Sequence, residues 1–331
     1  MAAPVSMPHR RLGKTGFDVG VIGFGAWAIG GSWGEVADSE AMAALHAAAD
    51  SGVTFFDTAD VYGDGRSERF IGRLLAERDE RLIVATKMGR RSPLDPALYT
   101  LENFRSWIDR SRRLLGVDRL DLTQLHCLGA DIYRRPDVWE ALDTLRQEGL
   151  IANYGVSVET VDEAMQALSI PGIASVQIIF NLFRQKPAEE FFPAAAAADV
   201  GVIARVPLAS GLLTGKLSAD SSFPTSDHRN FNRHGEAFDV GETFAGVPYE
   251  LGLAAVEKVR AAARDLPLTG AALRWILMFD QVSTVIPGAK NAAQAIDNAS
   301  VASLGPLDPG FMAEAREIYR EVIAPAVHQR W

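Results

Sequence analysis

The sequence predicts an α/β protein that folds as a closed (β/α)₈ barrel, and three observations favour this fold. Short apolar runs rich in β-branched residues recur along the chain, as is typical of strands buried on both faces. We count eight such runs, and a segment with helical spacing of apolar residues follows each of them. Strand–helix alternation predicts a parallel sheet, and eight units with no change of composition predict a closed ring.

The expected strands are, in order, residues 19–24, 53–56, 82–86, 120–125, 151–157, 173–179, 201–206 and 282–286. The helix expected at 38–52 begins with an Asp/Ser pair suited to an N-cap and ends at a glycine. The helix at 102–116 has Phe104 and Ile108 on one face and also ends at a glycine. Further helical patterns lie at 136–149, 159–169, 187–201, 248–265 and 290–303.

An open, doubly wound sheet is the competing fold. Residues 23–31 ("GFGAWAIGG") contain several glycines, but their spacing does not match the dinucleotide-binding fingerprint and the next helix begins too late. We therefore expect residues 1–331 to form a single barrel domain with an N-terminal β-hairpin. Two additions are expected: a long loop after strand 7, at about 207–248, and an extra C-terminal helix within 308–327.

Composition excludes several classes of function. The chain has 331 residues and a formal net charge of −9, which makes it a poor binder of nucleic acid or anionic membranes. Cys127 is the only cysteine, so no internal disulfide can form, and a cytoplasmic location is expected. The sequence has no signal-peptide pattern and no apolar run of ~18 residues, so no membrane span is expected.

The histidines are scattered without the spacing of a metal site, so no metal is expected. Two of them, His228 and His234, lie in the long loop, and there we expect solvated side chains.

Polar residues stand where the expected strands end, which is where a barrel of this kind builds its active site. Asp57 and Tyr62 follow the second strand, Lys87 ends the third and His126 ends the fourth. Each alone could be a helix cap, a packing residue or a solvated strand end. Because three consecutive strands carry them, however, the barrel should bring them to one mouth.

The four side chains suit reduction of a carbonyl group. A phenol has a pKa of about 10, and a nearby ammonium should lower the pKa of Tyr62. Asp57 would fix the position and charge of Lys87, and His126 could hydrogen-bond a substrate carbonyl. None of these groups supplies electrons, so a hydride would have to come from a cofactor.

The motifs "GVTFFDTADVYGDGRSERFIGRLL", "VATKMG", "LDLTQLH", "QIIFNLF" and "VPLASGLLTGK" together resemble the aldo-keto reductase superfamily over nearly the whole chain. Within it, the sequence is similar to the bacterial groups related to potassium-channel β subunits. The resemblance implies that Asp57, Tyr62, Lys87 and His126 form the catalytic tetrad, with Tyr62 as general acid.

The resemblance also implies a nicotinamide cofactor. Ser157 and Gln177 match positions that bind the nicotinamide carboxamide, and Arg205 matches one that stacks on its ring. Residues that match the pyrophosphate loop are Pro207, Leu208, Gly211, Leu213, Gly215 and Lys216. The adenosine end is matched by Gly288, Ala289, Lys290, Gln294 and Asn298. Trp27 and Trp33 are expected in the substrate pocket.

Some positions depart from the family pattern. Val158 replaces an asparagine that is common after Ser157, and Gln294 stands where NADP-specific relatives often have arginine. Lys290 could still bind a 2′-phosphate, so NADP(H) is favoured and NAD(H) remains possible.

Three functions follow from these observations. The first is an NADP(H)-dependent oxidoreductase of the alcohol dehydrogenase type, which reduces an aldehyde or ketone. The second is an NAD(P)-linked sugar or alcohol dehydrogenase working in the oxidative direction. The third is a nucleotide-binding, redox-sensing regulatory subunit. The partner expected in each case is a small molecule, and the oligomeric state stays open.

Overall fold

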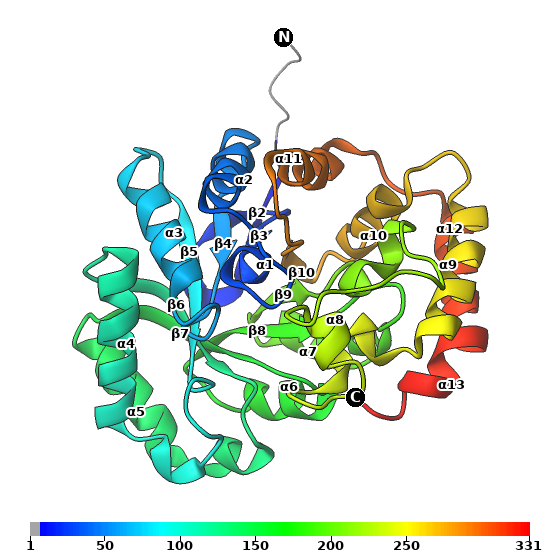
Figure 1. Ribbon diagram of the computed structural model, residues 1–331. Coiled ribbons are helices and arrows are strands. Elements are labelled where there is room, and N and C mark those ends of the chain that lie inside the picture. Colours follow the sequence, from blue (N-terminus) through cyan, green and yellow to red (C-terminus); the bar gives the residue numbers. More distant parts are fainter. Residues whose placement is uncertain (1–6) are drawn as a thin grey trace.

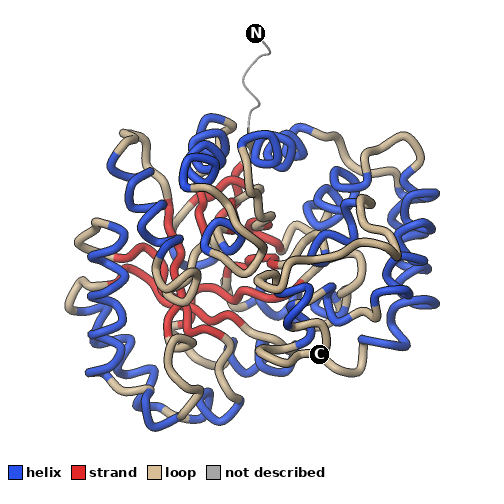
Figure 2. Tube along the Cα trace, in the orientation of Figure 1, coloured by secondary structure: helices blue, strands red, loops and turns tan. Residues whose placement is uncertain are grey.

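Eight parallel strands form the centre of the computed structural model, which describes residues 7–331. The strands follow one another in the sheet in sequence order, and the helices surround them (Figures 1 and 2). They are β3 (Phe24–Gly25), β4 (Phe55–Asp57), β5 (Ile83–Met88), β6 (Leu120–His126), β7 (Ile151–Ser157), β8 (Ile173–Ile179), β9 (Gly201–Arg205) and β10 (Val282–Val285).

The first and last of these strands, β3 and β10, meet and close the ring. Parallel bridges join Ile22 to Val285 and Gly25 to Gly288. A β-carbon on Gly25 would lie 2.7 Å from the carbonyl oxygen of Ile286, so the close approach of these two segments requires a glycine. The predicted (β/α)₈ barrel is therefore confirmed.

A β-hairpin covers the end of the barrel at which the strands begin. Its strands, β1 (His9–Arg11) and β2 (Asp18–Gly20), pair antiparallel, which confirms the expected N-terminal hairpin. The Arg10 guanidinium donates hydrogen bonds to the carbonyl oxygens of Leu277, Phe279 and Val282 at 2.8, 2.9 and 2.7 Å. The single strand expected at 19–24 is divided in the structure. Its first two residues belong to the hairpin strand β2, and only its last residue, Phe24, belongs to the barrel strand β3.

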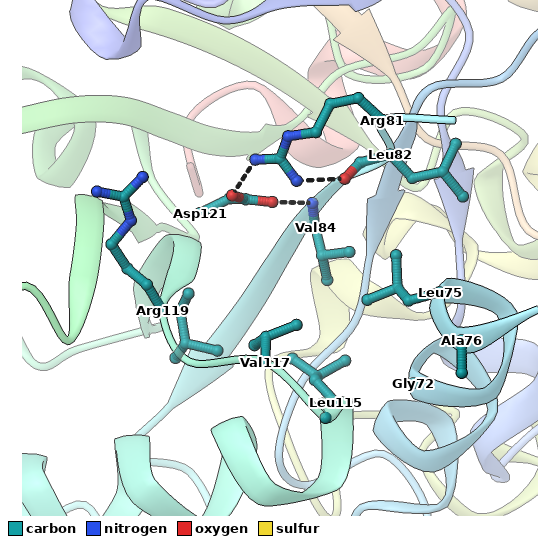
Figure 3. A pocket seen from close by; sticks show the side chains of 12 residues that line it. Gly72, Leu75, Ala76, Arg81, Leu82, Val84, Leu115, Val117, Arg119 and Asp121 are labelled. Atoms are coloured by element: carbon teal, nitrogen blue, oxygen red, sulfur yellow. Dashed lines mark hydrogen bonds and ion pairs between the residues drawn. The ribbon is translucent and has the colours of Figure 1, made fainter. Parts of the chain in front are cut away.

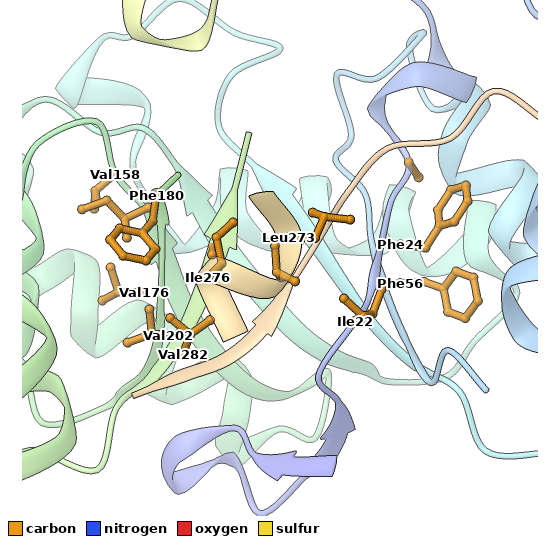
Figure 4. Close-up of a cluster of buried hydrophobic side chains, with 14 of the residues drawn as sticks. Ile22, Phe24, Phe56, Val158, Val176, Phe180, Val202, Leu273, Ile276 and Val282 are labelled. Atoms are coloured by element: carbon orange, nitrogen blue, oxygen red, sulfur yellow. The ribbon is translucent and has the colours of Figure 1, made fainter. Parts of the chain in front are cut away.

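Two apolar clusters fill the molecule. The smaller one brings Leu12 and Val19 of the hairpin region onto apolar residues inside the barrel, namely Phe55, Ile83, Ala85, Leu122, Ile203 and Ile286. The larger one lies between the strands and the surrounding helices, and Figure 4 shows part of it around Val176, Phe180 and Ile276. Because both faces of each strand are covered, the strands read as continuous apolar runs.

The helices around the barrel are α2 (Asp38–Asp50), α3 (Arg66–Ala76), α4 (Leu101–Leu115), α5 (Pro136–Gln147), α6 (Val161–Leu168), α7 (Phe191–Ala197), α9 (Tyr249–Ala263), α10 (Leu268–Leu277) and α11 (Ala292–Ser300). The sequence patterns did not include α10. It is buried over most of its length, so the 3.6-residue alternation of apolar and polar residues is weak there. Two short helices, α1 (Trp27–Gly30) and α8 (His228–Phe231), lie in loops.

The two additions to the barrel are present. The connection from β9 to α9 contains α8 and several 3₁₀ turns, one of them at Val240–Glu242. After α11, the chain forms α12 (Pro309–Ile318), a π-helical turn at Tyr319–Ile323 and α13 (Ala324–Val327), which lie beside α9 in Figure 1. Within residues 7–331, no helix combines the length and apolar character needed to cross a membrane.

Replacing Leu122 by alanine should lower the free energy of unfolding by about 2–5 kcal/mol, because it opens a cavity inside the barrel. The matched control is Leu94→Ala, since the Leu94 side chain is exposed and should contribute little. Urea unfolding followed by circular dichroism measures both changes. Equal losses in the two variants would contradict the proposed packing.

Candidate active site

A cavity of about 750 Å³ opens at the end of the barrel where the strands finish. Its wall includes Asp57 and His126, the last residues of β4 and β6, and Tyr62 from the loop after β4. A second pocket, of about 290 Å³, lies between the ends of α3 and α4 and the edges of β5 and β6 (Figure 3). It contains an Arg81–Asp121 ion pair but none of the predicted site residues.

A buried ion pair joins β4 to β5 beneath the cavity. The ammonium Nζ of Lys87 lies 2.5 Å from Oδ1 of Asp57, and both side chains are almost fully buried. The same Nζ donates to the carbonyl oxygen of Thr58 at 2.9 Å. Burial lowers the pKa of Lys87, but Asp57 acts in the opposite direction and favours the ammonium form.

Two amide side chains complete the surroundings of Asp57. Oδ2 of Asp57 accepts a hydrogen bond from Nε2 of Gln177 at 2.7 Å and a longer one from Nε2 of Gln124 at 3.4 Å. With its nitrogen committed to Asp57, Gln177 presents its carbonyl oxygen for other interactions. These partners offset the cost of burying an ion pair.

Tyr62 lies over this ion pair and borders the cavity. Its hydroxyl is 3.4 Å from Nζ of Lys87, and its ring stacks on Trp27 at a centroid distance of 6.0 Å. A β-carbon on Gly30 would lie 2.7 Å from Cβ of Tyr62, so the backbone near residue 30 must approach Tyr62 without a side chain.

The pKa of Tyr62 corrects one expectation. Burial, followed by the charges of Asp57 and Glu242, raises it well above its usual range, although Lys87 was expected to lower it. The phenol therefore remains protonated at neutral pH.

His126 is a neutral imidazole in this site. Burial lowers its pKa well below the usual value, and the positive charges of Arg90, Lys87 and Arg205 lower it further. Its Nδ1 is buried without a hydrogen-bond partner, while the ring borders the cavity and lies edge-on to Tyr62 at 6.0 Å. A neutral ring can donate one hydrogen bond to a ligand, but it cannot act as an imidazolium acid.

Most of the predicted cofactor residues lie along the same cavity. Those on its wall are Ser157, Gln177, Arg205, Pro207, Leu208, Gly211, Lys216, Gly288, Ala289, Lys290, Gln294 and Asn298. Two others do not reach it: Leu213 is buried in the core, and a β-carbon on Gly215 would meet Leu268 and Arg260. Asn298 donates to the carbonyl of Gly288 at 3.1 Å, which ties α11 to the loop after β10.

The cavity suits a long, anionic ligand with a flat ring. Lys216, Arg229 and Lys290 contribute positive charge to its wall. Ala209, Ser210 and Gly211 have consecutive positive φ angles of 47°, 52° and 100°, a strained backbone of the kind found in ligand-binding loops. Near Tyr62, Nε of Arg205 is buried without a partner. These features are compatible with a nicotinamide dinucleotide.

Trp27 and Trp33, the two predicted pocket residues, border the cavity and pack edge to face at 5.5 Å. His228 packs against both rings, with centroid distances of 4.7 and 4.5 Å. Its side chain is fully buried, and its Nδ1 lies 3.1 Å from Oγ1 of Thr243. The expectation of a solvated His228 was therefore wrong, whereas His234 is exposed.

Two charged wall residues, Arg229 and Glu242, were not singled out from the sequence. Both lie in the long loop, and no strand end or motif pointed to them. Arg229 is held by Asp227 and lies over the ring of Phe223 at 4.3 Å. The only sequence signal for Arg229 was its spacing from Asp227, two residues before it, in a segment flanked by Phe223 and Phe231.

One set of possible metal ligands occurs within residues 7–331. Ligand atoms of Cys127, Glu159 and Glu242 lie within 4.8 Å of one another. Arg90 and Arg205, however, already donate to these carboxylates at 2.7 and 2.8 Å and supply the positive charge. The absence of a metal stays a prediction.

Comparison with known proteins confirms the resemblance. The model of the aldo/keto reductase family matches residues 21–320. "Uncharacterized oxidoreductase YqkF" of Bacillus subtilis is 29% identical over 302 residues, covering 90% of this chain and 92% of the relative. A probable voltage-gated potassium channel subunit beta of Oryza sativa is 29% identical over 328 residues, covering 91% and 93%. The holo form of the aldo-keto reductase AKR11C1 from Bacillus halodurans has a TM-score of 0.76 at 26% identity, covering 95% and 96%.

The burial of His228 should make stability depend on pH. Burial lowers its pKa from 6.5 to about 4, so between these values the unfolded chain binds a proton that the folded chain does not. As the pH falls through this window, the free energy of unfolding should decrease by up to about 1.4 kcal/mol per pH unit from this group.

The variant His228→Gln should lack this contribution, whereas the exposed His234→Gln, as matched control, should retain it. Urea unfolding between about pH 7 and 5 measures the slopes. An unchanged slope in His228→Gln would count against the burial of a neutral ring.

Proposed function

The chain belongs to the aldo/keto reductase family, and on that premise we propose that it reduces an aldehyde or a ketone to an alcohol. In this proposal, a reduced nicotinamide cofactor supplies the hydride when it is bound, because no side chain of the site can. Ser157, Gln177 and Arg205 would hold its nicotinamide end.

The observation that carries the proposal is the pairing of a protonated phenol with a neutral imidazole on one cavity wall. Because the pKa of Tyr62 is raised and that of His126 is lowered by burial, only Tyr62 retains a proton that it can transfer. His126 would donate a hydrogen bond to the substrate carbonyl, which orients it and stabilises negative charge on its oxygen.

We propose reduction as the working direction, in which Tyr62, protonated at neutral pH, acts as the general acid. Because its raised pKa makes this proton harder to release, the transfer needs a group that stabilises the phenolate. Asp57 and Lys87 would then act together: the carboxylate holds the ammonium, and the ammonium lies 3.4 Å from the phenol oxygen. Negative charge that develops on that oxygen during proton transfer would be stabilised there.

We propose NADP(H) rather than NAD(H) as the cofactor. Positive charge on the cavity wall from Lys216, Arg229 and Lys290 supports a ligand with an additional phosphate. Lys290 is half-buried, and its ammonium donates to the carbonyl oxygen of Trp33. It would bind the 2′-phosphate as a point charge.

A nucleotide-binding regulatory subunit is a second candidate, favoured by the name of the Oryza sativa relative. Such a subunit would bind NADPH tightly and turn over poorly. A panel of aromatic aldehydes, aldoses and keto-steroids, followed by loss of NADPH absorbance, separates the two functions.

Replacing Tyr62 by phenylalanine should lower kcat by ~10²-fold or more, because the proton donor is lost. NADPH affinity, measured by fluorescence titration, should be nearly intact. Tyr99→Phe is the matched control, since the buried Tyr99 hydroxyl has no hydrogen-bond partner and does not border the cavity. Turnover that survives in Tyr62→Phe would show that another group is the acid.

The variant Lys290→Ala should weaken NADPH binding by about tenfold or more, the effect of losing one charge-assisted hydrogen bond. NADH binding should be almost unchanged, because NADH has no 2′-phosphate. Lys258→Ala, on the exposed face of α9, is the control. Equal losses for the two cofactors would refute the 2′-phosphate role.

A further inference from the structure

Four charged side chains from separate segments are buried together beside the cavity. Arg90 follows β5, Glu159 follows β7, Arg205 ends β9 and Glu242 lies in the long loop. Arg205 is 8% exposed and Glu242 5%, and the side chains of Glu159 and Arg90 are 12% and 18% exposed. Burial of so many charges is costly unless each is closely paired.

The pairing is centred on Arg205. Its Nη2 donates to Oε2 of Glu159 at 2.8 Å and to the carbonyl oxygen of Val158 at 3.0 Å. Its Nη1 lies 3.9 Å from Oε1 of Glu242, which also accepts from Nη1 of Arg90 at 2.7 Å. Because guanidinium hydrogen bonds lie in the plane of the group, these contacts leave its flat faces free.

The two carboxyl groups also lie close to each other. Oε1 of Glu159 is buried without a hydrogen-bond partner, although a ligand oxygen of Glu159 and one of Glu242 come within 4.8 Å. Two ionised carboxylates this close repel, so one proton between them relieves both the repulsion and the unpaired oxygen. Burial raises the pKa of Glu159. Burial acts the same way on Glu242, but Arg90 and Arg205 outweigh it and lower its pKa.

We propose that Glu159 and Glu242 are positioning residues that act through Arg205, with Glu159 as a neutral carboxylic acid and Glu242 as the ionised carboxylate. Glu159 accepts from Arg205 through Oε2 and donates to Glu242 through Oε1. The pair fixes the plane of the guanidinium at the cavity wall, where it serves as the platform for the nicotinamide ring. This inference rests on the proposed function.

The main chain at Glu159 and at Glu242 is held by side chains other than Arg205. The amide of Glu159 donates to Oε2 of Glu163 at 2.9 Å, and its carbonyl accepts from Nη2 of Arg184 at 3.2 Å. The carbonyl of Glu242 accepts from Oγ of Ser210 at 3.1 Å. Rigid supports of this kind allow the pair to orient a third group.

The indole of Trp331 supports the loop on the other side of Glu242. Its Nε1 donates to Oδ1 of Asp239 at 3.0 Å, and the Arg184 guanidinium lies 4.0 Å over its ring. A β-carbon on Gly246 would overlap this indole, and one on Gly241 would meet the Asp239 carboxylate and the Arg184 guanidinium that contact it. The turn that carries Glu242 is therefore held by Ser210 on one side and by Trp331 on the other, and from it the Glu242 side chain reaches Arg205.

The substitutions Glu159→Gln and Glu242→Gln should differ in their effect on NADPH binding, and this difference tests which of the two carboxyl groups carries the proton. Glu159→Gln should retain NADPH affinity within about threefold, because glutamine is also neutral and can accept from Arg205 and donate to Glu242. Glu159→Ala and Glu242→Gln should each weaken NADPH binding by about tenfold or more, because Arg205 loses a partner or its counter-charge. The exposed Glu190→Gln is the matched control.

A merely structural role for Glu159 would make Glu159→Gln as damaging as Glu159→Ala, and that result would overturn the proposal. So would wild-type affinity in Glu242→Gln. Circular dichroism of each variant checks that the barrel is retained.

Infrared spectroscopy tests the protonation directly and without a cofactor. At neutral pH the wild-type protein should show a carbonyl band of a buried carboxylic acid that Glu159→Gln removes and Glu190→Gln keeps. Because Asp60 is also buried with a raised pKa, the difference between the wild type and Glu159→Gln is the readout, and identical carbonyl regions in these two proteins would overturn the proposal. If the band is present but the wild type does not bind NADPH, the proposed function fails while the carboxyl pair stands.

Discussion

The buried ion pair between Asp57 and Lys87 is the interaction on which the site depends. It joins two neighbouring strands, and Gln124 and Gln177 extend its hydrogen bonds to β6 and β8. Removing one partner of such a pair leaves an uncompensated charge in the core, which typically costs about 3–5 kcal/mol. The pair therefore couples the packing of the barrel to the position of the phenol above it. A site of this kind tolerates change in its loops more readily than in its strand ends.

Charge is distributed unevenly in this protein. The chain as a whole is acidic, with a formal net charge of −9, yet Arg205, Lys216, Arg229 and Lys290 gather along one cavity. Positive charge of this kind attracts an anionic ligand, although Asp57, Glu242 and Asp297 on the same wall offset part of it. The composition of the chain could not predict this local grouping of cations.

The sequence predicted the features that depend on local pattern. Apolar runs located the strands, and the rule that parallel barrels place their sites at strand ends brought Asp57, Tyr62, Lys87 and His126 together. It could not predict features that depend on contacts between distant segments. Glu242 and His228 lie in a loop whose path is determined by Trp331, Trp27 and Trp33, and the direction of the Tyr62 pKa depends on how deeply the ring is buried. Helix α10 was missed because it is almost entirely apolar, with only Thr269 and Arg274 to mark a polar face.

Closure of the barrel has a consequence for how the chain acquires its structure. Arg10 binds the carbonyl oxygen of Val282, 272 residues further along, and Ile22 pairs with Val285. During synthesis, the hairpin and the first barrel strand must therefore wait until nearly all of the remaining chain has left the ribosome. Contacts of such long range form slowly, and until they form the apolar side chains of Leu12 and Phe55 stay uncovered. The part of the barrel that is made first is thus completed last, and its apolar surface stays exposed until the last strand arrives.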